Sequence, residues 1–516
     1  MNAFLQILRQ LFEAVTPESW KAQAFFPLAL GPQDRSRLHD LVVFHQTARE
    51  AYGIAWIDFK HFDNLIIFPF CMVRYRTDEA LISLAPWSLR DARADETFYH
   101  HMRGSLRKNN HLVTVKGNIL ATKAHTGDPT VTAVSIDQDT NHLLVRVDAL
   151  EAYKVFRTTA RENPVSIEID MMEYLSNTAD FKGIARLISS LEYTTTAGAS
   201  HLVALSMNYV QSRGTLWNQM LVLLQESRYP RWNQMGKELN HWNKCLELIQ
   251  KAGRLVADFH RCMMNAKKPA SITPVSLDAT QLQGWKDHFR SYISEMINQT
   301  EHIQQKFNQY HQVFFRKIKS VGEKIFIELD SIEQVGLLIM NHGHLHLGQI
   351  LMGDLRLTLL DFQTTPSHQS AHQFEKMRQS CLHDYVALYM SVQFAWALST
   401  HGPDSMVFRD ILDRDSEYGS YFYQKASEKG SQSNPEIILE NLQSALAKSY
   451  FRALKDDPLT SELFPPGGAD FEILLRVYLF ARCLKEILLN SEPGNPKAVV
   501  ALQMLNQLET EHRNLV

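Results

Sequence analysis

The chain has 516 residues, which is too long for one ordinary hydrophobic core, so we expect two or three domains. Its composition, 45% hydrophobic and 21% charged, excludes an intrinsically disordered protein, and a net charge of −3 gives no reason to expect a nucleic-acid or membrane-surface partner. The five cysteines lie far apart without a CxxC pair, which favours a reducing compartment, and no apolar run is long enough to span a bilayer. We therefore expect a cytoplasmic protein with no membrane association.

The first part of the chain is predicted to begin with one helix and then to be rich in strands. Apolar residues recur at helical spacing over residues 2–16, which indicates an amphipathic helix. Strands are expected at 40–45, 52–59, 64–75, 111–116, 131–136, 142–147, 151–158, 186–193 and 202–210. Two helices are expected among them, at 92–107 and 166–176, the second introduced by Asn163-Pro164.

From Thr215 onward the pattern is helical almost throughout. The main helical blocks are predicted at 217–226, 234–265, 280–319, 331–340, 374–398, 435–454, 471–489 and 496–511. A strand-rich part followed by a large helical part predicts an α+β fold with two unequal lobes. The segment 208–214 is the natural hinge between them.

Two short segments in the helical part carry the most specific signal. Residues 341–349 read NHGHLHLGQ, and ten residues past Gln349 the run LLDFQ begins at Leu359. Together they have the pattern of the catalytic loop and the metal-binding segment of a kinase-like phosphotransferase. Phosphoryl transfer requires a cation beside the phosphates, oxygen ligands for magnesium, and a group that orients the attacking hydroxyl.

Lys154 is the candidate cation. It lies on a predicted strand and is followed fourteen residues later by Glu168, near the start of a predicted helix. A strand lysine paired with a helix glutamate holds the α- and β-phosphates in kinase-type enzymes. Lysines on strands before acidic helices are common, however, so the alternative is a surface lysine and a solvated glutamate.

Gln349 and Asp361 are the candidate magnesium ligands. Asp361 ends an apolar, strand-like run, and a hairpin around Asp354 would bring it close to Gln349, so that a carboxylate and an amide oxygen meet. A rival interpretation is a zinc site, because His342, His344 and His346 alternate and would share one face of a strand. No further ligand of the usual kind follows at short spacing, which favours magnesium.

The run 341–363 resembles the HGDxHLGQ…DFE signature of the bacterial maltokinases, relatives of the aminoglycoside and choline phosphotransferases. Other segments resemble the same family in the expected order. They are the lysine strand KVFR at 154–157, the helix AGRLVADFH at 252–260, the helix 374–397 and the closing helices from 474.

The resemblance implies a bilobal, protein-kinase-like fold and an ATP- and Mg²⁺-dependent kinase that phosphorylates maltose, or a related sugar, at its anomeric hydroxyl. It implies an N-terminal cap subdomain at 1–115, a nucleotide-binding N-lobe at 116–212 and a helical C-lobe at 213–516. The residues it assigns to the nucleotide are Lys154 and Glu168 at the phosphates, and the segment Met207–Val210, with Met207, Tyr209 and Val210, at the adenine. It assigns Gln349 and Asp361 to magnesium, and places His344 where the family has its catalytic aspartate.

His344 leaves the activity open. Removing a general base typically costs about 10²–10⁴-fold in rate, and a neutral imidazole could in principle accept the proton. Gln363, where the family has an acidic residue, is a second departure. One hypothesis is a working sugar kinase, and the other is a pseudokinase that binds nucleotide or sugar and supports a glucan- or trehalose-pathway enzyme. A kinase with another acceptor and a metal-dependent hydrolase are further alternatives.

Overall fold

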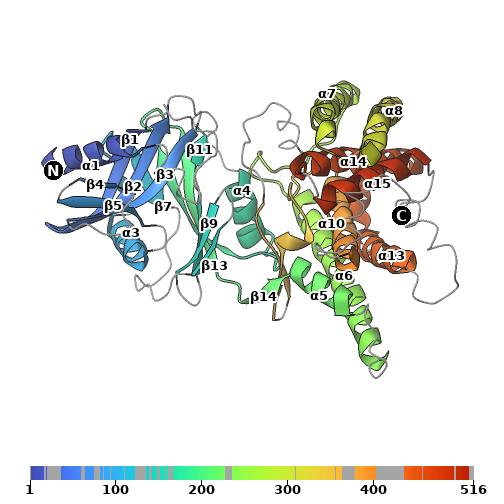
Figure 1. Ribbon diagram of the computed structural model, residues 1–516, viewed down its shortest axis with the longest axis horizontal. Coiled ribbons are helices and arrows are strands. Elements are labelled where there is room, and N and C mark those ends of the chain that lie inside the picture. Colours follow the sequence, from blue (N-terminus) through green and yellow to red (C-terminus); the bar gives the residue numbers. More distant parts are fainter. Residues whose placement is uncertain are drawn as a thin grey trace. The chain divides into compact units, whose positions relative to one another are not determined.

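The computed structural model forms two compact units, each described here by itself (Figure 1). The N-unit comprises residues 1–176 and 185–210, and the C-unit comprises residues 177–184 and 211–516. The structure describes residues 2–16, 19, 36–59, 64–74, 82–84, 86–92, 95–109, 111–122, 135–138, 142–147, 151–156, 158–160, 167–226, 235–307, 309–354, 356–362, 378–401, 435–455, 457–492 and 495–510.

The first sheet of the N-unit packs against the N-terminal helix. Its strands run in the order β1 (Ser36–Gln46), β2 (Glu50–Phe59), β3 (Asn64–Val73), β5 (Trp87–Asp91) and β4 (Ile82–Leu84), and β11 (Thr158–Ala160) pairs with β3. The predicted amphipathic helix is α1 (Asn2–Ala14). Its residue Phe12 is fully buried and meets the rings of Phe68 and Phe70 edge to face, so the apolar stripe of α1 completes this core.

The second sheet of the N-unit has seven strands. Their order is β6 (His111–Val113), β7 (Ile119–Thr122), β12 (Leu187–Thr194), β13 (Ser200–Asn208), β10 (Glu151–Phe156), β9 (His142–Arg146) and β8 (Ser135–Gln138). The helices of this unit are α3 (Glu96–Asn109) and α4 (Ile167–Glu173), which runs into a π-helical turn at Tyr174–Thr178.

A buried carboxylate joins the two sheets. Asp40 of β1 accepts hydrogen bonds from Thr114 (2.6 Å), Asn118 (2.6 Å) and Tyr193 (3.0 Å), and the Tyr193 ring stacks on Trp56 at 4.2 Å. A charge-assisted network of this kind fixes the sheets relative to one another. The division of this region at residue 115 stays a prediction, because the contacts group both sheets in one unit.

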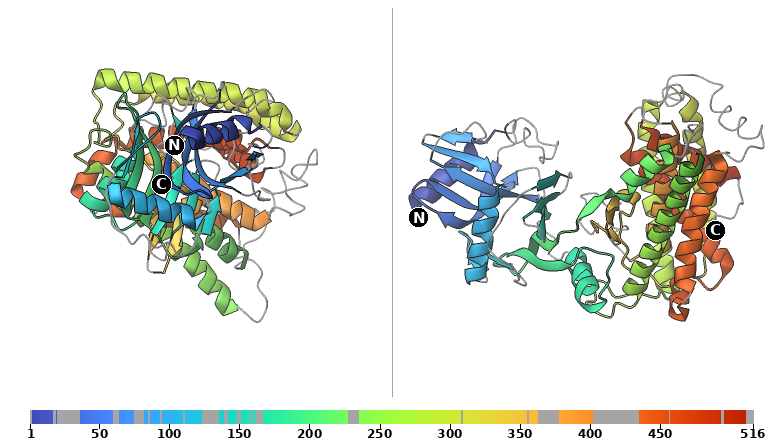
Figure 2. Two further views of the ribbon diagram at one scale, coloured as in Figure 1. Left: turned by 90° about the vertical axis from the view of Figure 1, so that its left-hand side faces the viewer. Right: turned by 90° about the horizontal axis from the view of Figure 1, so that it is seen from below.

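The C-unit is helical around a small sheet. The sheet consists of β14 (Ser212–Thr215), β15 (Ile350–Gly353) and β16 (Leu357–Leu359), all antiparallel. Its long helices are α5 (Leu216–Glu226), α6 (Met235–Met264), α7 (Ala279–Ile303), α8 (Gln309–Ser331), α10 (Leu382–His401), α13 (Pro435–Lys455), α14 (Gly468–Leu489) and α15 (Pro496–Thr510). Figure 2 shows α6 and α13 side by side, and Gly253 of α6 lets the backbones approach closely at Leu446. The predicted α+β plan with two unequal parts is confirmed.

The helix predicted at 331–340 is wrong. Helix α8 ends at Ser331, and the next residues run extended, with Leu338 bridging to Val275 and Ile339 to Gln379. Gly336 has a left-handed φ of +72°, which interrupts a helix and suits glycine. The block predicted at 280–319 is two helices, since α7 ends at Ile303 and α8 begins at Gln309, and the helix predicted from 374 begins at Leu382.

Gln363 lies outside the described residues. In the part of the chain that the structure describes, no helix has the length and hydrophobicity needed to cross a membrane.

Candidate functional site

Lys154 and Glu168 form a buried ion pair in the N-unit. Every residue of β10 is buried, the strand is paired along both edges with β9 and β13, and Lys154 lies in its middle. Its Nζ lies 2.7 Å from the Glu168 Oε1 in the first turn of α4, and both side chains are less than a tenth exposed. The structure therefore brings together the two residues that the sequence proposes for the phosphates.

The three residues proposed for the adenine lie where β13 ends. Met207 is buried, Tyr209 and Val210 are half-buried, and the guanidinium of Arg146 lies 4.3 Å from the centre of the Tyr209 ring. These are the last residues of the N-unit. Their role with a nucleotide stays a prediction.

The backbone of the histidine loop, residues 341–349, is held by one carboxylate of helix α10. Asp384 is fully buried and accepts hydrogen bonds from the backbone N–H of His342 (2.6 Å) and of Gly343 (3.1 Å). Its Oδ2 also lies 3.2 Å from Nε2 of His260, whose Nδ1 is 2.7 Å from the hydroxyl of Tyr450. Burial alone would raise the pKa of Asp384, but the contacts of its carboxylate with His260 and with His383, whose Nδ1 lies 3.6 Å from Oδ1, hold that pKa well below its ordinary value.

Asp384 was not found by sequence reasoning. It stands in the first turn of a helix that is otherwise strongly apolar there, and a single carboxylate in such a run is the signal that could have identified it.

Gln349 and Asp361 lie close together behind this loop. The Nε2 of His342 lies 2.6 Å from the carbonyl oxygen of Leu360, and the N–H of Leu360 donates to the carbonyl of Gln349 at 2.9 Å. These contacts bring the side-chain amide of Gln349 to 3.4 Å from the Asp361 Oδ2. Asp361 adopts a left-handed φ of +59°, an uncommon conformation that functional sites often contain.

This pair has the donor set that magnesium prefers. Rotating the Gln349 amide by 180°, which exchanges its oxygen and nitrogen, would present an amide oxygen beside the Asp361 carboxylate. Both are hard oxygen ligands, and the usual protein contribution to a nucleotide-bound Mg²⁺ is one or two such groups. Gln349 and Asp361 thus fit the ion that the sequence predicts for them.

His344 lies in a half-buried position with cations around it. Burial and then the charge of Arg482, followed by those of His346 and Lys485, lower its pKa from 6.5 to about 2. Its Nδ1 is buried without a hydrogen-bond partner. The side chain at 344 is therefore a neutral imidazole that offers a lone pair but resists protonation.

The other two histidines of the loop have structural contacts. His342 is bonded to the carbonyl of Leu360, and the Nδ1 of His346 accepts from the N–H of Gly348 at 3.0 Å, which caps the short 3-10 helix 347–349. Among the described residues, these three histidines do not form a metal-binding cluster. The zinc interpretation of their alternation is not supported, since two rings are already engaged by the backbone.

Helix α14 places two cations, Arg482 and Lys485, near the loop. Arg482 is buried and pairs through Nη2 with Glu486, while its Nε and Nη1 are buried without partners. Arg482 and Lys485 line a cavity of about 20 Å³, room for about one water molecule, together with Phe289, Tyr292, Gln379, His383, Tyr478 and Ala481. Two cations and no carboxylate line this cavity.

Comparisons with known proteins show the fold. No protein-family model matches the sequence, and a search of curated proteins finds no match either. Three solved structures of glucosamine kinase match over nearly their whole length. One crystal form (B) has a TM-score of 0.64 and 17% identity, covering 98% of this chain and 99% of that one. A complex with glucosamine, ADP and inorganic phosphate has a TM-score of 0.62 and 18% identity, and crystal form A has 0.61 and 17%, each covering 97% of this chain and 98% of the other. The chain has a bilobal, kinase-like fold.

Proposed function

We propose that this chain binds Mg-ATP and transfers its terminal phosphoryl group to a sugar hydroxyl. The observation that carries the proposal is the buried pair of Lys154 and Glu168. A buried ion pair is weak evidence for stability, since well-packed apolar residues of the same volume often stabilise as much or more. Contact with a phosphate would explain why a lysine in an ion pair lies in the middle of a buried strand.

The described residues include a candidate for each of three roles in phosphoryl transfer: phosphate binding, magnesium binding and orientation of the acceptor hydroxyl. Lys154, held by Glu168, would bind the α- and β-phosphates, and Gln349 and Asp361 would hold magnesium, which neutralises the phosphate oxygens when bound. The acceptor oxygen would form a bond to the γ-phosphorus while the bond from that phosphorus to the bridging oxygen of ADP breaks, and the proton of the acceptor hydroxyl would pass to water. His344 would orient that hydroxyl by accepting a hydrogen bond at the unprotonated ring nitrogen of its neutral imidazole.

The acceptor that these charges favour is a neutral or acidic sugar. Although Glu486 pairs with Arg482, the charges of Arg482 and Lys485 still lower the pKa of His344, so a protonated amino group beside His344 would be repelled in the same way. A glucosamine-like acceptor is disfavoured on this ground, although the solved structures with the same fold are glucosamine kinases. Maltose, or a related sugar phosphorylated at the anomeric hydroxyl, agrees with this and with the maltokinase-like sequence pattern.

A second candidate is a pseudokinase, and one observation favours it. With its pKa lowered to about 2, His344 is a poor proton acceptor, so transfer would be slow or absent even with nucleotide bound. The protein would then act as a nucleotide- or sugar-binding partner of a glucan- or trehalose-pathway enzyme. Both candidates require Mg-ATP binding by the same residues.

The test is calorimetric titration with Mg-ATP, followed by phosphorus NMR with maltose and with glucosamine. We expect Asp361→Asn and the double change Lys154→Met with Glu168→Gln to abolish binding, the second change avoiding an unpaired buried carboxylate. Lys182→Met, at an exposed lysine, is the matched control and should bind normally. A sugar 1-phosphate signal with maltose identifies a kinase, binding without product identifies a pseudokinase, and absence of binding refutes both.

A further inference from the structure

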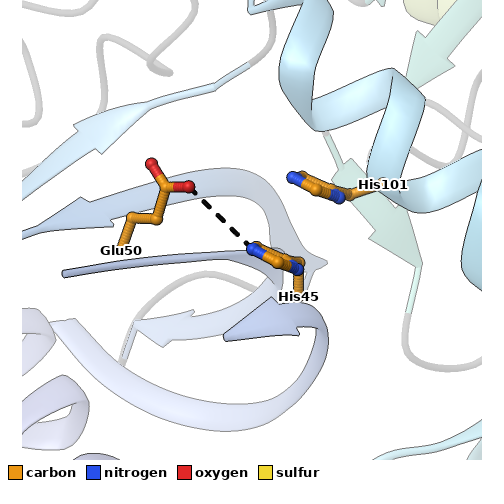
Figure 3. A group of neighbouring side chains, drawn as sticks. All are labelled: His45, Glu50 and His101. Atoms are coloured by element: carbon orange, nitrogen blue, oxygen red, sulfur yellow. Dashed lines mark ion pairs between the residues drawn. The ribbon is translucent and has the colours of Figure 1, made fainter. Parts of the chain in front are cut away.

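A cluster of metal-ligating side chains lies in the N-unit, among residues to which the proposed phosphoryl transfer gives no role. His45 of β1, Glu50 of β2 and His101 of α3 each offer one ligand atom, and these atoms lie within 4.8 Å of one another. The Nε2 of His45 is 3.9 Å from a carboxylate oxygen of Glu50. The two imidazole rings are stacked, with centres 3.8 Å apart and planes inclined by 2°. Figure 3 shows one nitrogen of each ring on the side that faces the Glu50 carboxylate.

We propose that His45, Glu50 and His101 bind a divalent transition-metal ion of the zinc class. Two imidazole nitrogens and one carboxylate oxygen are the ligand types that zinc and its neighbours take, and magnesium and calcium prefer oxygen alone. Three protein ligands leave a fourth position for water or another ligand. The ion would link the β1–β2 hairpin to helix α3 and so stabilise the N-unit.

The separations are compatible with this ion. Ligand bonds of about 2.0–2.1 Å in tetrahedral geometry place neighbouring donor atoms roughly 3.3 Å apart. The three atoms therefore have to close by at most about 1.5 Å. The two parallel rings also have to turn out of their stack, so that their lone pairs converge on the ion. The His45 side chain is 32% exposed and that of Glu50 is 40% exposed, so both can rotate toward an ion and an ion can enter from solvent.

The backbones that carry these ligands are fixed without the metal. Thr47 closes the hairpin between His45 and Glu50, since its Oγ1 accepts from the N–H of Arg49 (3.2 Å) and of Glu50 (3.1 Å). Helix α3 is tied to β1 by a hydrogen bond from the Ser105 hydroxyl to the carbonyl of Phe44 at 2.9 Å. Ligands placed on elements that are already rigid lose little entropy when the ion binds.

The simpler alternative is an ion pair between a protonated His45 and Glu50. A pair at 3.9 Å between partly exposed groups contributes little to stability. Packing of Tyr52 against both imidazoles accounts for the stacked rings, but it gives no reason for a carboxylate to lie close to both of them. A shared cation accounts for all three donors together.

The test uses full-length protein treated with a chelator and no nucleotide, so it is independent of the proposed kinase activity. Titration with Co²⁺ should produce ligand-field absorption that saturates at one ion per chain, and Zn²⁺ should displace it. A group that merely orients a ligand costs about 10–100-fold in affinity when removed, so His45→Ala and His101→Ala should each cost at least about 100-fold. Glu50→Gln, which keeps size at a partly exposed position, should weaken binding and alter the spectrum.

His111→Ala, at an exposed histidine of the same unit, is the control and should bind cobalt like the parent. Thermal unfolding of metal-free protein shows whether each variant is folded. The proposal is overturned if the folded Glu50→Gln or histidine variants bind cobalt as tightly as the parent, or if no saturable spectrum appears.

Discussion

Replacing His344 by aspartate is expected to accelerate phosphoryl transfer. Burial, the largest cause of the low pKa of His344, would raise the pKa of an aspartate at this position, but the charges of Arg482 and Lys485 would oppose that rise and favour the carboxylate. A positioned general base contributes typically about 10²–10⁴-fold. Since the role proposed for the neutral imidazole of the parent is to orient the hydroxyl, we expect His344→Asp to raise kcat by about 10²-fold, near the lower end of that range.

The assay is ADP release at saturating Mg-ATP and maltose, with Mg-ATP affinity measured separately by calorimetry. His344→Asn is the matched control, because it has nearly the shape of aspartate but cannot accept a proton. An equal gain in His344→Asn would attribute the effect to size rather than basicity. A parent enzyme that outpaces His344→Asp would refute the electrostatic reasoning altogether.

Three further predictions concern stability, each measured by urea denaturation. Asp384→Ala should lower the free energy of unfolding by about 3–5 kcal/mol, because it leaves backbone donors and a histidine unpaired in a fully buried site. Because the pKa of Asp384 is depressed, the stability that Asp384 contributes is complete above about pH 4 and is lost as the pH falls below it. His344 and His346, whose pKa values are lowered to about 2 and about 4, bind fewer protons in the folded state than in the unfolded state. The free energy of unfolding should therefore fall as the pH drops from 6.5 toward 4. His344→Gln should make this pH dependence less steep, and an unchanged slope would contradict the prediction. Gly253→Ala should cost about 1–3 kcal/mol, because a Cβ there would collide with the Ser449 hydroxyl across α6 and α13, and Ser449→Ala in the same chain should recover part of the loss.

Periodicity predicted most elements because burial in this fold follows the local pattern. Helix α1 has one apolar stripe, and strands β2 and β3 are nearly continuous apolar runs, so each was recognisable without neighbours. The helix predicted at 331–340 is wrong because Val335, Leu338 and Ile339 have helical spacing in the sequence but do not lie in a helix. Their structure is decided by pairing with Val275 and Gln379, far away in the sequence, which no local pattern contains.

In the candidate site, too, the features set by nearby residues could be predicted from the sequence, and those set by distant residues could not. The proximity of Gln349 and Asp361 could be predicted, since one short hairpin joins them, and the Lys154–Glu168 pair follows from a strand and the next helix. The partner of the histidine loop could not, because Asp384 lies 42 residues beyond His342. The low pKa of His344 was equally hidden, since it depends on which face of α14 carries Arg482.

The attachment of the histidine loop to Asp384 has an evolutionary consequence. The groups that fix this loop in space are backbone N–H donors, and a backbone donor is present whatever side chain the residue carries. Position 344 can therefore exchange its side chain while the loop keeps its course. Such a site can lose, regain or change its chemistry through single substitutions, because none of them removes the hydrogen bonds that keep the loop folded.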